Sequence, residues 1–85
     1  MTKQDLLLLV KSGAVQSAGI LSRNGQFEIW VQTDSAGEEP NVDDVHTTRG
    51  ELRRWSRLDN AYSFLRECGV RGTIGVDDAP SVVIV

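Results

Sequence analysis

The dipeptide Asn24-Gly25 constrains the fold of this chain most, because it separates two runs with the composition of β-strands. Both residues tolerate the positive φ angles that a type I′ turn requires. We therefore expect residues 14–23 and 26–33 to form an antiparallel hairpin. A turn of two residues also fixes the register, so every residue of one strand has a defined partner on the other.

This register divides the hairpin into two faces. The apolar face, which we expect in the core, carries Ala18, Ile20, Phe27, Ile29 and Val31. The opposite face carries Leu21, Glu28, Trp30 and Gln32. Trp30 lies directly across from Gly19, where an indole ring can cover the volume that glycine leaves empty. Trp30 is therefore either a structural cover or a platform for a binding partner.

The first helix is expected from about Lys3 to Lys11. Thr2 precedes Asp5 by three residues, which is the spacing of a capping box, and Gly13 can close the helix in the left-handed conformation. The successive leucines 6–9 would cover most of a helix circumference, so their periodicity alone does not exclude a strand.

A second helix is expected after Ser56, because Ser56 and Asp59 repeat a helix-start spacing and Gly69 follows. Apolar residues then recur every three or four positions. The expected buried stripe consists of Leu58, Ala61, Tyr62, Leu65 and Cys68. The expected solvated side consists of Asn60, Ser63, Arg66 and Glu67.

The remaining segments are a loop, two strands and a tail. Residues 34–44 have the composition of an exposed, flexible loop, and their charged side chains are all acidic. Val45–Trp55 is expected as a polar strand that is bent or bulged at Gly50. A last strand is expected at about Val70–Val76. The tail 77–85 is rich in β-branched residues, so it forms an added edge strand, within the fold or across a dimer, or an exposed adhesive segment.

The expected order is thus helix, strand, strand, strand, helix, strand. We expect a single α+β domain over residues 1–85, because a chain this short cannot form two cores. Each helix has one apolar side to bury. A small antiparallel sheet with both helices on one face satisfies this requirement.

Composition narrows the class of protein. The formal net charge of −3 disfavours a protein that coats DNA or an anionic membrane through its overall field. Cys68 is the only cysteine, so the chain forms no internal disulfide and no cysteine-based metal site. The apolar N-terminal run is too short for a signal core, and no segment approaches membrane-spanning length. A cytoplasmic location is therefore expected.

The sequence carries no recognisable motif for catalysis or metal binding. His46 is the only histidine and has no motif around it, so we expect no enzyme. The acidic pairs Asp43-Asp44 and Asp77-Asp78 lack the spaced ligands of a calcium loop. No glycine pattern precedes a helix in the manner of a phosphate-binding loop. Neither a cofactor nor a metal is expected.

The most distinctive surface candidate is the segment Arg49–Arg57, which holds four of the nine basic residues together with Trp55. The residues expected to bind a partner are Trp30, Arg49, Arg53, Arg54, Trp55 and Arg57. Arginine and tryptophan anchor protein interfaces, but they also bind single-stranded nucleic acid by charge and stacking. A third interpretation places Trp55 in the core, beneath arginines paired with Glu51, Asp59 or the acidic loop.

Three segments carry a family resemblance. The run Thr47–Val70, the pair Val76-Asp77 and the opening Asp5–Gly13 resemble small ParC-type accessory proteins of plasmid and integrative-element partition modules. The aspartate-rich loop and the valine-rich tail depart from that pattern. The resemblance implies a non-enzymatic cytoplasmic protein linked to maintenance or transfer of a mobile element, and it implies no catalytic residues.

Two functional hypotheses follow. The first is a small adaptor that binds a protein partner or itself through the arginine segment and Trp30. The alternative is a nucleic-acid-binding module that uses the Arg49–Arg57 segment. The net acidity favours the adaptor, since phosphate binding would gain little from the field of the whole molecule.

Overall fold

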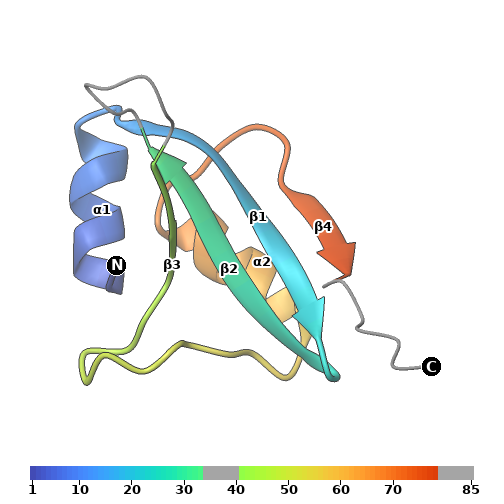
Figure 1. Cartoon of the computed structure of the whole chain (residues 1–85). Helices are drawn as coiled ribbons and strands as arrows, with labels where there is room; N and C mark the ends of the chain where they lie inside the picture. The colour runs from blue at the N-terminus through green and yellow to red at the C-terminus, as the bar shows by residue number, and fades with distance from the viewer. Residues whose placement is uncertain (34–40, 79–85) are drawn as a thin grey trace.

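A computed structural model of the chain describes residues 1–33 and 41–78. Its elements, in chain order, are α1 (Lys3–Lys11), β1 (Val15–Arg23), β2 (Gln26–Thr33), β3 (Asn41–Asp44), α2 (Leu58–Glu67) and β4 (Gly75–Asp78). The strands form one sheet in the order β3-β2-β1-β4 (Figure 1). The expected α+β class and the expected order of helices and strands are confirmed.

The hairpin of β1 and β2 has the expected turn and register. Asn24 and Gly25 have φ angles of 53° and 75°, as a type I′ turn requires. Arg23 pairs with Gln26 and Ile20 pairs with Ile29. The register shifts once, near the start of β1. The turn therefore decides which side chains of both strands face the core.

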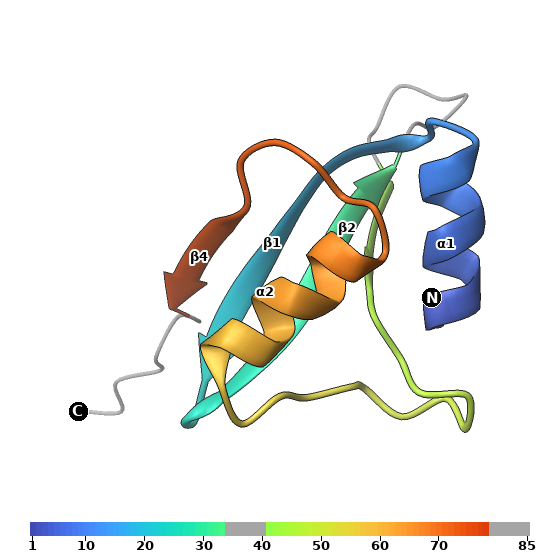
Figure 2. The same ribbon diagram turned by 180° about the vertical axis from the view of Figure 1, so that it is seen from behind.

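The core lies on one side of the sheet and receives side chains from both helices (Figure 2). Its buried residues are Leu6, Ala18, Ile20, Ile29, Val31, Val45, Trp55, Ala61, Phe64, Leu65, Cys68 and Val70. Full burial of one such valine, leucine or isoleucine side chain stabilises a fold by about 1.5–3 kcal/mol. Phe27, which we expected in the core, is only half-buried at its margin.

Helix α1 begins with the expected capping box. The Thr2 hydroxyl accepts a hydrogen bond from the Asp5 amide at 3.3 Å, and the Asp5 carboxylate accepts one from the Thr2 amide at 3.0 Å. These bonds satisfy two amides that a helix start leaves unpaired. After the C-cap Ser12, Gly13 adopts a φ of 75° and turns the chain into β1.

Helix α2 begins without the side-chain cap that we expected from Ser56. Its N-cap is Arg57, an extended residue whose side chain makes no capping hydrogen bond. The arginine instead donates hydrogen bonds to both carboxylate oxygens of Asp59, at 3.3 and 3.4 Å. The Asp59 carboxylate, which the sequence pattern assigned to a capping box with Ser56, is thus paired with Arg57 instead.

The expected buried stripe of α2 is correct only in part. Ala61, Leu65 and Cys68 are buried, and Phe64 joins them, whereas Leu58 and Tyr62 are 40% and 42% exposed. Successive helix residues are about 100° apart, so these two residues lie at one edge of the apolar arc. The helix turns the other edge, with Phe64, toward Trp55.

The third strand lies earlier in the chain than expected. Strand β3 spans Asn41–Asp44, within the segment 34–44 that we predicted to be a loop, and residues 34–40 of that loop lie outside the described residues. The predicted polar strand Val45–Trp55 is wrong. Gly50 adopts a φ of 87° in a turn that brings the Thr47 amide to 2.7 Å from the Glu51 carbonyl oxygen. The glycine therefore reverses the chain and does not form a bulge.

The segment after this turn still joins the sheet. Trp55 and Phe27 exchange two backbone hydrogen bonds of 2.8 Å, one from each amide. This bridge lies along β2 beyond the end of β3. The edge of β2 is therefore paired first by β3 and then by the residue that leads toward α2.

The prediction of a purely antiparallel sheet is wrong, because the last strand pairs in parallel. Strand β4 pairs in parallel with β1, with Gly19 beside Gly75 and Leu21 beside Asp77, so the sheet is mixed. A connection through a helix commonly joins strands of the same direction, and α2 lies on this path. The predicted strand Val70–Val76 begins too early, because Val70 is a core residue before the strand.

Arg66 fixes the connection between α2 and β4. Its guanidinium donates hydrogen bonds to the carbonyl oxygens of Val70 at 3.0 Å and Gly72 at 2.8 Å. Its Nε also donates to the Tyr62 hydroxyl at 2.9 Å. Arg66 therefore has a structural role that its expected position on a solvated helix side did not indicate. Asp77 and Asp78 end β4, and the rest of the predicted tail strand, 79–85, lies outside the described residues.

Replacing Gly19 with alanine should destabilise the sheet. A Cβ atom at this position would lie 2.6 Å from Nε1 of Trp30, well inside van der Waals contact. Overpacking of this kind lowers the free energy of unfolding by about 1–3 kcal/mol. Gly75→Ala is the matched control on the adjacent strand, since its Cβ would meet no described atom within 4 Å. Urea unfolding followed by tryptophan fluorescence measures both, and equal losses would contradict the close Gly19–Trp30 contact.

The capping box gives an expectation for pH dependence. Hydrogen bonds from Thr2, first from its backbone amide and then from its hydroxyl, lower the pKa of Asp5 below its ordinary value of 3.8. The carboxylate therefore stabilises the fold above that value, and this contribution is lost as pH falls through the lowered pKa. Asp5→Asn should reduce the free energy of unfolding at pH 7, with a difference from wild type that shrinks in acid. A difference independent of pH would contradict this role.

Candidate functional site

The four arginines of the Arg49–Arg57 segment do not share one surface. Arg53 lies on the core side, with its guanidinium carbon 4.9 Å from the Trp55 ring centroid and 4.7 Å from that of Phe64. A guanidinium over an aromatic face contributes about 0.5–2 kcal/mol, depending on its exposure to solvent. Arg53 therefore closes one side of the core.

Arg54 points to the other side of the sheet, where it meets Glu28. Its Nε lies 3.5 Å from the Glu28 carboxylate, and the Nε of Arg23 lies 3.4 Å from the same oxygen. The Glu28 side chain is only 7% exposed, whereas both arginines are about half exposed. One nearly buried carboxylate thus holds two guanidinium groups at the hairpin end of the sheet.

The other two arginines lie elsewhere. Arg57 pairs with Asp59 at the start of α2, and both side chains are well exposed, so this pair adds little stability. Arg49 is exposed in the turn that Gly50 closes, and it forms no ion pair among the described residues. The four arginines of the Arg49–Arg57 segment therefore do not form one continuous surface.

Trp55 belongs to the core. Its ring is buried and packs against Phe64 with 5.0 Å between centroids and an interplanar angle of 52°. Such tilted aromatic pairs stabilise a core beyond the area that they bury. Trp55 is thus covered by Phe64 and Arg53 and does not offer a free ring for stacking, so its predicted role in binding is not supported.

Trp30 lies on the sheet face that points away from the helices, which we call the open sheet face. Its indole covers Gly19, as the hairpin register predicted, and the ring is half-buried. By strand pairing, this face also carries Leu21, Gln32 and Val42. Val42 is 59% exposed. Within residues 1–33 and 41–78, no helix lies over this face (Figure 1).

Carboxylates border the open sheet face. Asp44 lies beside Trp30 on β3, and Asp77 lies beside Leu21 on β4. Arg23 and Arg54, at the hairpin end, are paired with Glu28. The face therefore combines an aromatic and aliphatic centre with charges of both signs at its border.

His46 has a structural environment. Its Nδ1 lies 2.8 Å from the Asp44 carbonyl oxygen and 3.3 Å from the Met1 amino nitrogen, and its amide donates to the Met1 carbonyl at 2.6 Å. The same amino group lies 2.9 Å from the Asp43 carboxylate and lowers the pKa of Asp43. These contacts join Met1 to β3, and the hydrogen bonds of His46 within the described part of the chain involve no serine or cysteine.

In residues 1–33 and 41–78, Cys68 and the acidic side chains form no cluster suited to metal binding. The Cys68 thiol is buried, and desolvation raises its pKa, which disfavours the reactive thiolate. Among the residues that the structure describes, no three His, Cys, Asp or Glu side chains are placed to hold a metal ion.

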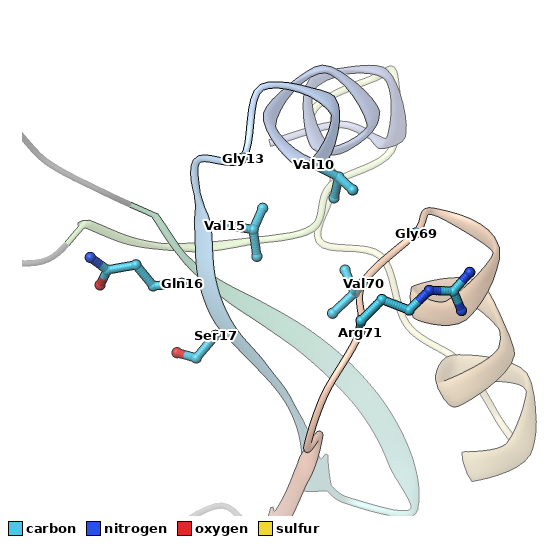
Figure 3. Close-up of a pocket in the computed structure, with 8 residues that line it drawn as sticks. All are labelled: Val10, Gly13, Val15, Gln16, Ser17, Gly69, Val70 and Arg71. Atoms are coloured by element: carbon cyan, nitrogen blue, oxygen red, sulfur yellow. The ribbon is translucent and has the colours of Figure 1, made fainter.

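One cavity of about 230 Å³ lies between the end of α1, the start of β1 and the connection after α2 (Figure 3). Val10, Val15 and Val70 point toward one another, while Arg71 extends away from them (Figure 3). Arg71 is the only charged residue among those that line it. Gln16 and Ser17 also line the cavity, but their side chains point away from these valines (Figure 3). The lining therefore lacks the convergent polar groups that typically orient a small ligand.

None of the helices in the described residues is both long and apolar enough to span a membrane.

Comparison with known proteins yields no match to any family model, curated protein or solved structure. The resemblance to ParC-type accessory proteins therefore remains an expectation from the sequence.

The Glu28 cluster should respond to mutation in a strongly non-additive way. Arg23→Gln or Arg54→Gln alone should lower the free energy of unfolding by about 1 kcal/mol or less, since the other arginine still pairs with Glu28. The double variant leaves an unpaired, nearly buried carboxylate and should cost about 3–5 kcal/mol.

Chemical denaturation of the four proteins in this cycle measures the coupling. Adding Glu28→Gln to the double variant should recover part of the loss, because the amide carries no charge. Strict additivity of the two arginine substitutions would contradict a shared carboxylate.

Proposed function

We propose that this protein is a non-enzymatic adaptor that binds a protein partner, or a second copy of itself, through the open sheet face. The main supporting observation is that no described helix covers this face, on which Trp30 of β2 lies diagonally next to Leu21 of β1 on one side and Val42 of β3 on the other. Tryptophan is enriched among residues that dominate protein interfaces. Arg23 and Arg54 add half-exposed guanidinium groups at its border.

The biological setting of this adaptor is proposed on separate grounds. A cytoplasmic role in the partition or maintenance of a plasmid or another mobile element is supported by the sequence resemblance alone. That setting requires a partner from the same machinery, and it requires no catalytic residues in this chain.

Nucleic-acid binding by the Arg49–Arg57 segment is the less supported alternative. Arg53 and Arg54 point to opposite sides of the sheet, and three of the four arginines already contact an aromatic ring or a carboxylate. Asp44 and Asp77 on the open sheet face would repel phosphate groups, as would the net charge of −3.

Val42→Lys should abolish partner binding without unfolding the protein. Val42 lies on the open sheet face and is 59% exposed, so a lysine fits there but places a charge in the interface. Leu8→Lys is the matched control, because Leu8 is also 59% exposed but lies on α1. Affinity capture from a host extract, with mass spectrometry and unfolding curves for each variant, should show a partner retained by wild type and Leu8→Lys only. Equal capture by both variants would contradict the proposed surface.

The nucleic-acid alternative is tested in parallel with labelled single-stranded and double-stranded oligonucleotides at low salt. We expect no binding in fluorescence anisotropy. Binding that weakens linearly with the logarithm of salt concentration, and whose slope is reduced by Arg49→Ala, would overturn the adaptor proposal in favour of the alternative.

A further inference from the structure

Strand β4 is the last strand of the sheet and has an open edge. It pairs with β1 on one side, and no described residue pairs with its other side. All its residues are exposed. The free backbone groups of such an edge can pair with a further strand.

Helix α2 lies over one side of the sheet, and β4 is the strand at the edge next to β1 (Figure 2). Exposed apolar side chains are present on this side of the sheet. Val76 pairs with the core residue Ile20, so it points to the same side as α2, but it remains 49% exposed. Leu58 and Tyr62, one helical turn apart, are 40% and 42% exposed. Arg66 links the Tyr62 hydroxyl to the backbone that leads into β4. We call Leu58, Tyr62 and β4 the β4 edge surface.

The chain itself contains a segment whose composition fits this surface. Ser81–Val85 carries no charged side chain, and its last four residues are valine or isoleucine. Such residues favour strands, and their side chains would alternate between the two faces of the sheet. This is the extended, apolar chemistry that strand addition beside a helix requires.

The connecting residues disfavour pairing with the β4 strand of the same copy. Only Ala79 and Pro80 separate Asp78 from Ser81. Both common two-residue hairpin turns require a positive φ at the first central position, which alanine adopts poorly. Proline fixes its own φ at about −65° and excludes the type I′ turn. The segment is therefore better suited to a second molecule.

Direct pairing of two β4 strands is less favourable. It would bring Asp77 and Asp78 of both copies into one short ladder, where like charges destabilise. Ser81–Val85 adds no acidic side chain to the edge. The acidic residues thus disfavour β4 pairing with itself and permit an uncharged strand.

We propose that Ser81–Val85 of each copy adds as a strand to the β4 edge surface of a second copy, in a reciprocal homodimer. The inference goes beyond the proposed function, because it places contact between two copies on the β4 edge surface and leaves partner binding on the open sheet face. Reciprocal exchange gives a closed twofold assembly in which both edges are covered. The open sheet face of each copy stays available for another partner.

Sedimentation velocity on the full-length chain over a range of concentrations tests this proposal. We expect a monomer–dimer equilibrium whose dissociation constant rises about tenfold or more with Ile84→Asp in the donated segment or Leu58→Asp on the receiving surface. Leu8→Lys should leave the constant unchanged. Circular dichroism and unfolding curves establish that each variant is folded.

Mixing the two aspartate variants provides the decisive comparison. Each variant retains the element that the other has lost, so the mixture should form a heterodimer with one intact donated strand, more tightly than either variant dimerises alone. Monomers at all concentrations, a dimer unaffected by Ile84→Asp, or a dimer lost with Val42→Lys would overturn the exchange. If either of the first two outcomes occurred, a captured partner whose binding is lost with Val42→Lys would still support the adaptor. Failure of the strand exchange can therefore be distinguished from failure of the proposed function.

Discussion

The register of the Asn24-Gly25 hairpin is the constraint on which the rest of the structure depends. Because the turn has two residues, it places Ala18, Ile20 and Ile29 on one face, where both helices add to the core. The same register places Trp30 over Gly19 on the opposite face. A shift of one residue would exchange the two faces and leave the helices without an apolar surface to cover.

The Arg49–Arg57 segment connects the second half of the chain to this hairpin through backbone hydrogen bonds and side-chain contacts. The Trp55–Phe27 bridge sets the alternation, so Arg53 turns inward onto two aromatic rings and Arg54 turns outward to Glu28. The neighbouring residues Arg53 and Arg54 thus make two separate contacts on opposite sides of the sheet. Arginines that are neighbours in the sequence need not form one surface when they lie on an extended chain.

The sequence predicted the features that depend on local chemistry. The capping box of α1, the hairpin register and the Gly19–Trp30 pair each involve near neighbours or a tight turn, and all three are present. Several of the errors concern long-range pairing. Glu28 was placed on the correct face, but its contact with Arg54 depends on the Trp55–Phe27 bridge, which no local pattern specifies. The bounds of strand β4 differ from the prediction because they depend on its parallel pairing with β1, a strand far away in the sequence.

The central claim is that this hairpin register separates a packed face from an open one, with the Trp30 ring directly over Gly19. Proton NMR tests it most directly, because a ring current shifts the α protons of a residue beneath an indole. The account requires upfield-shifted Gly19 α protons with strong nuclear Overhauser contacts to the Trp30 ring. Gly19 α protons at ordinary shifts, with Trp30 contacting Ala61 or Leu65 of α2, would contradict it.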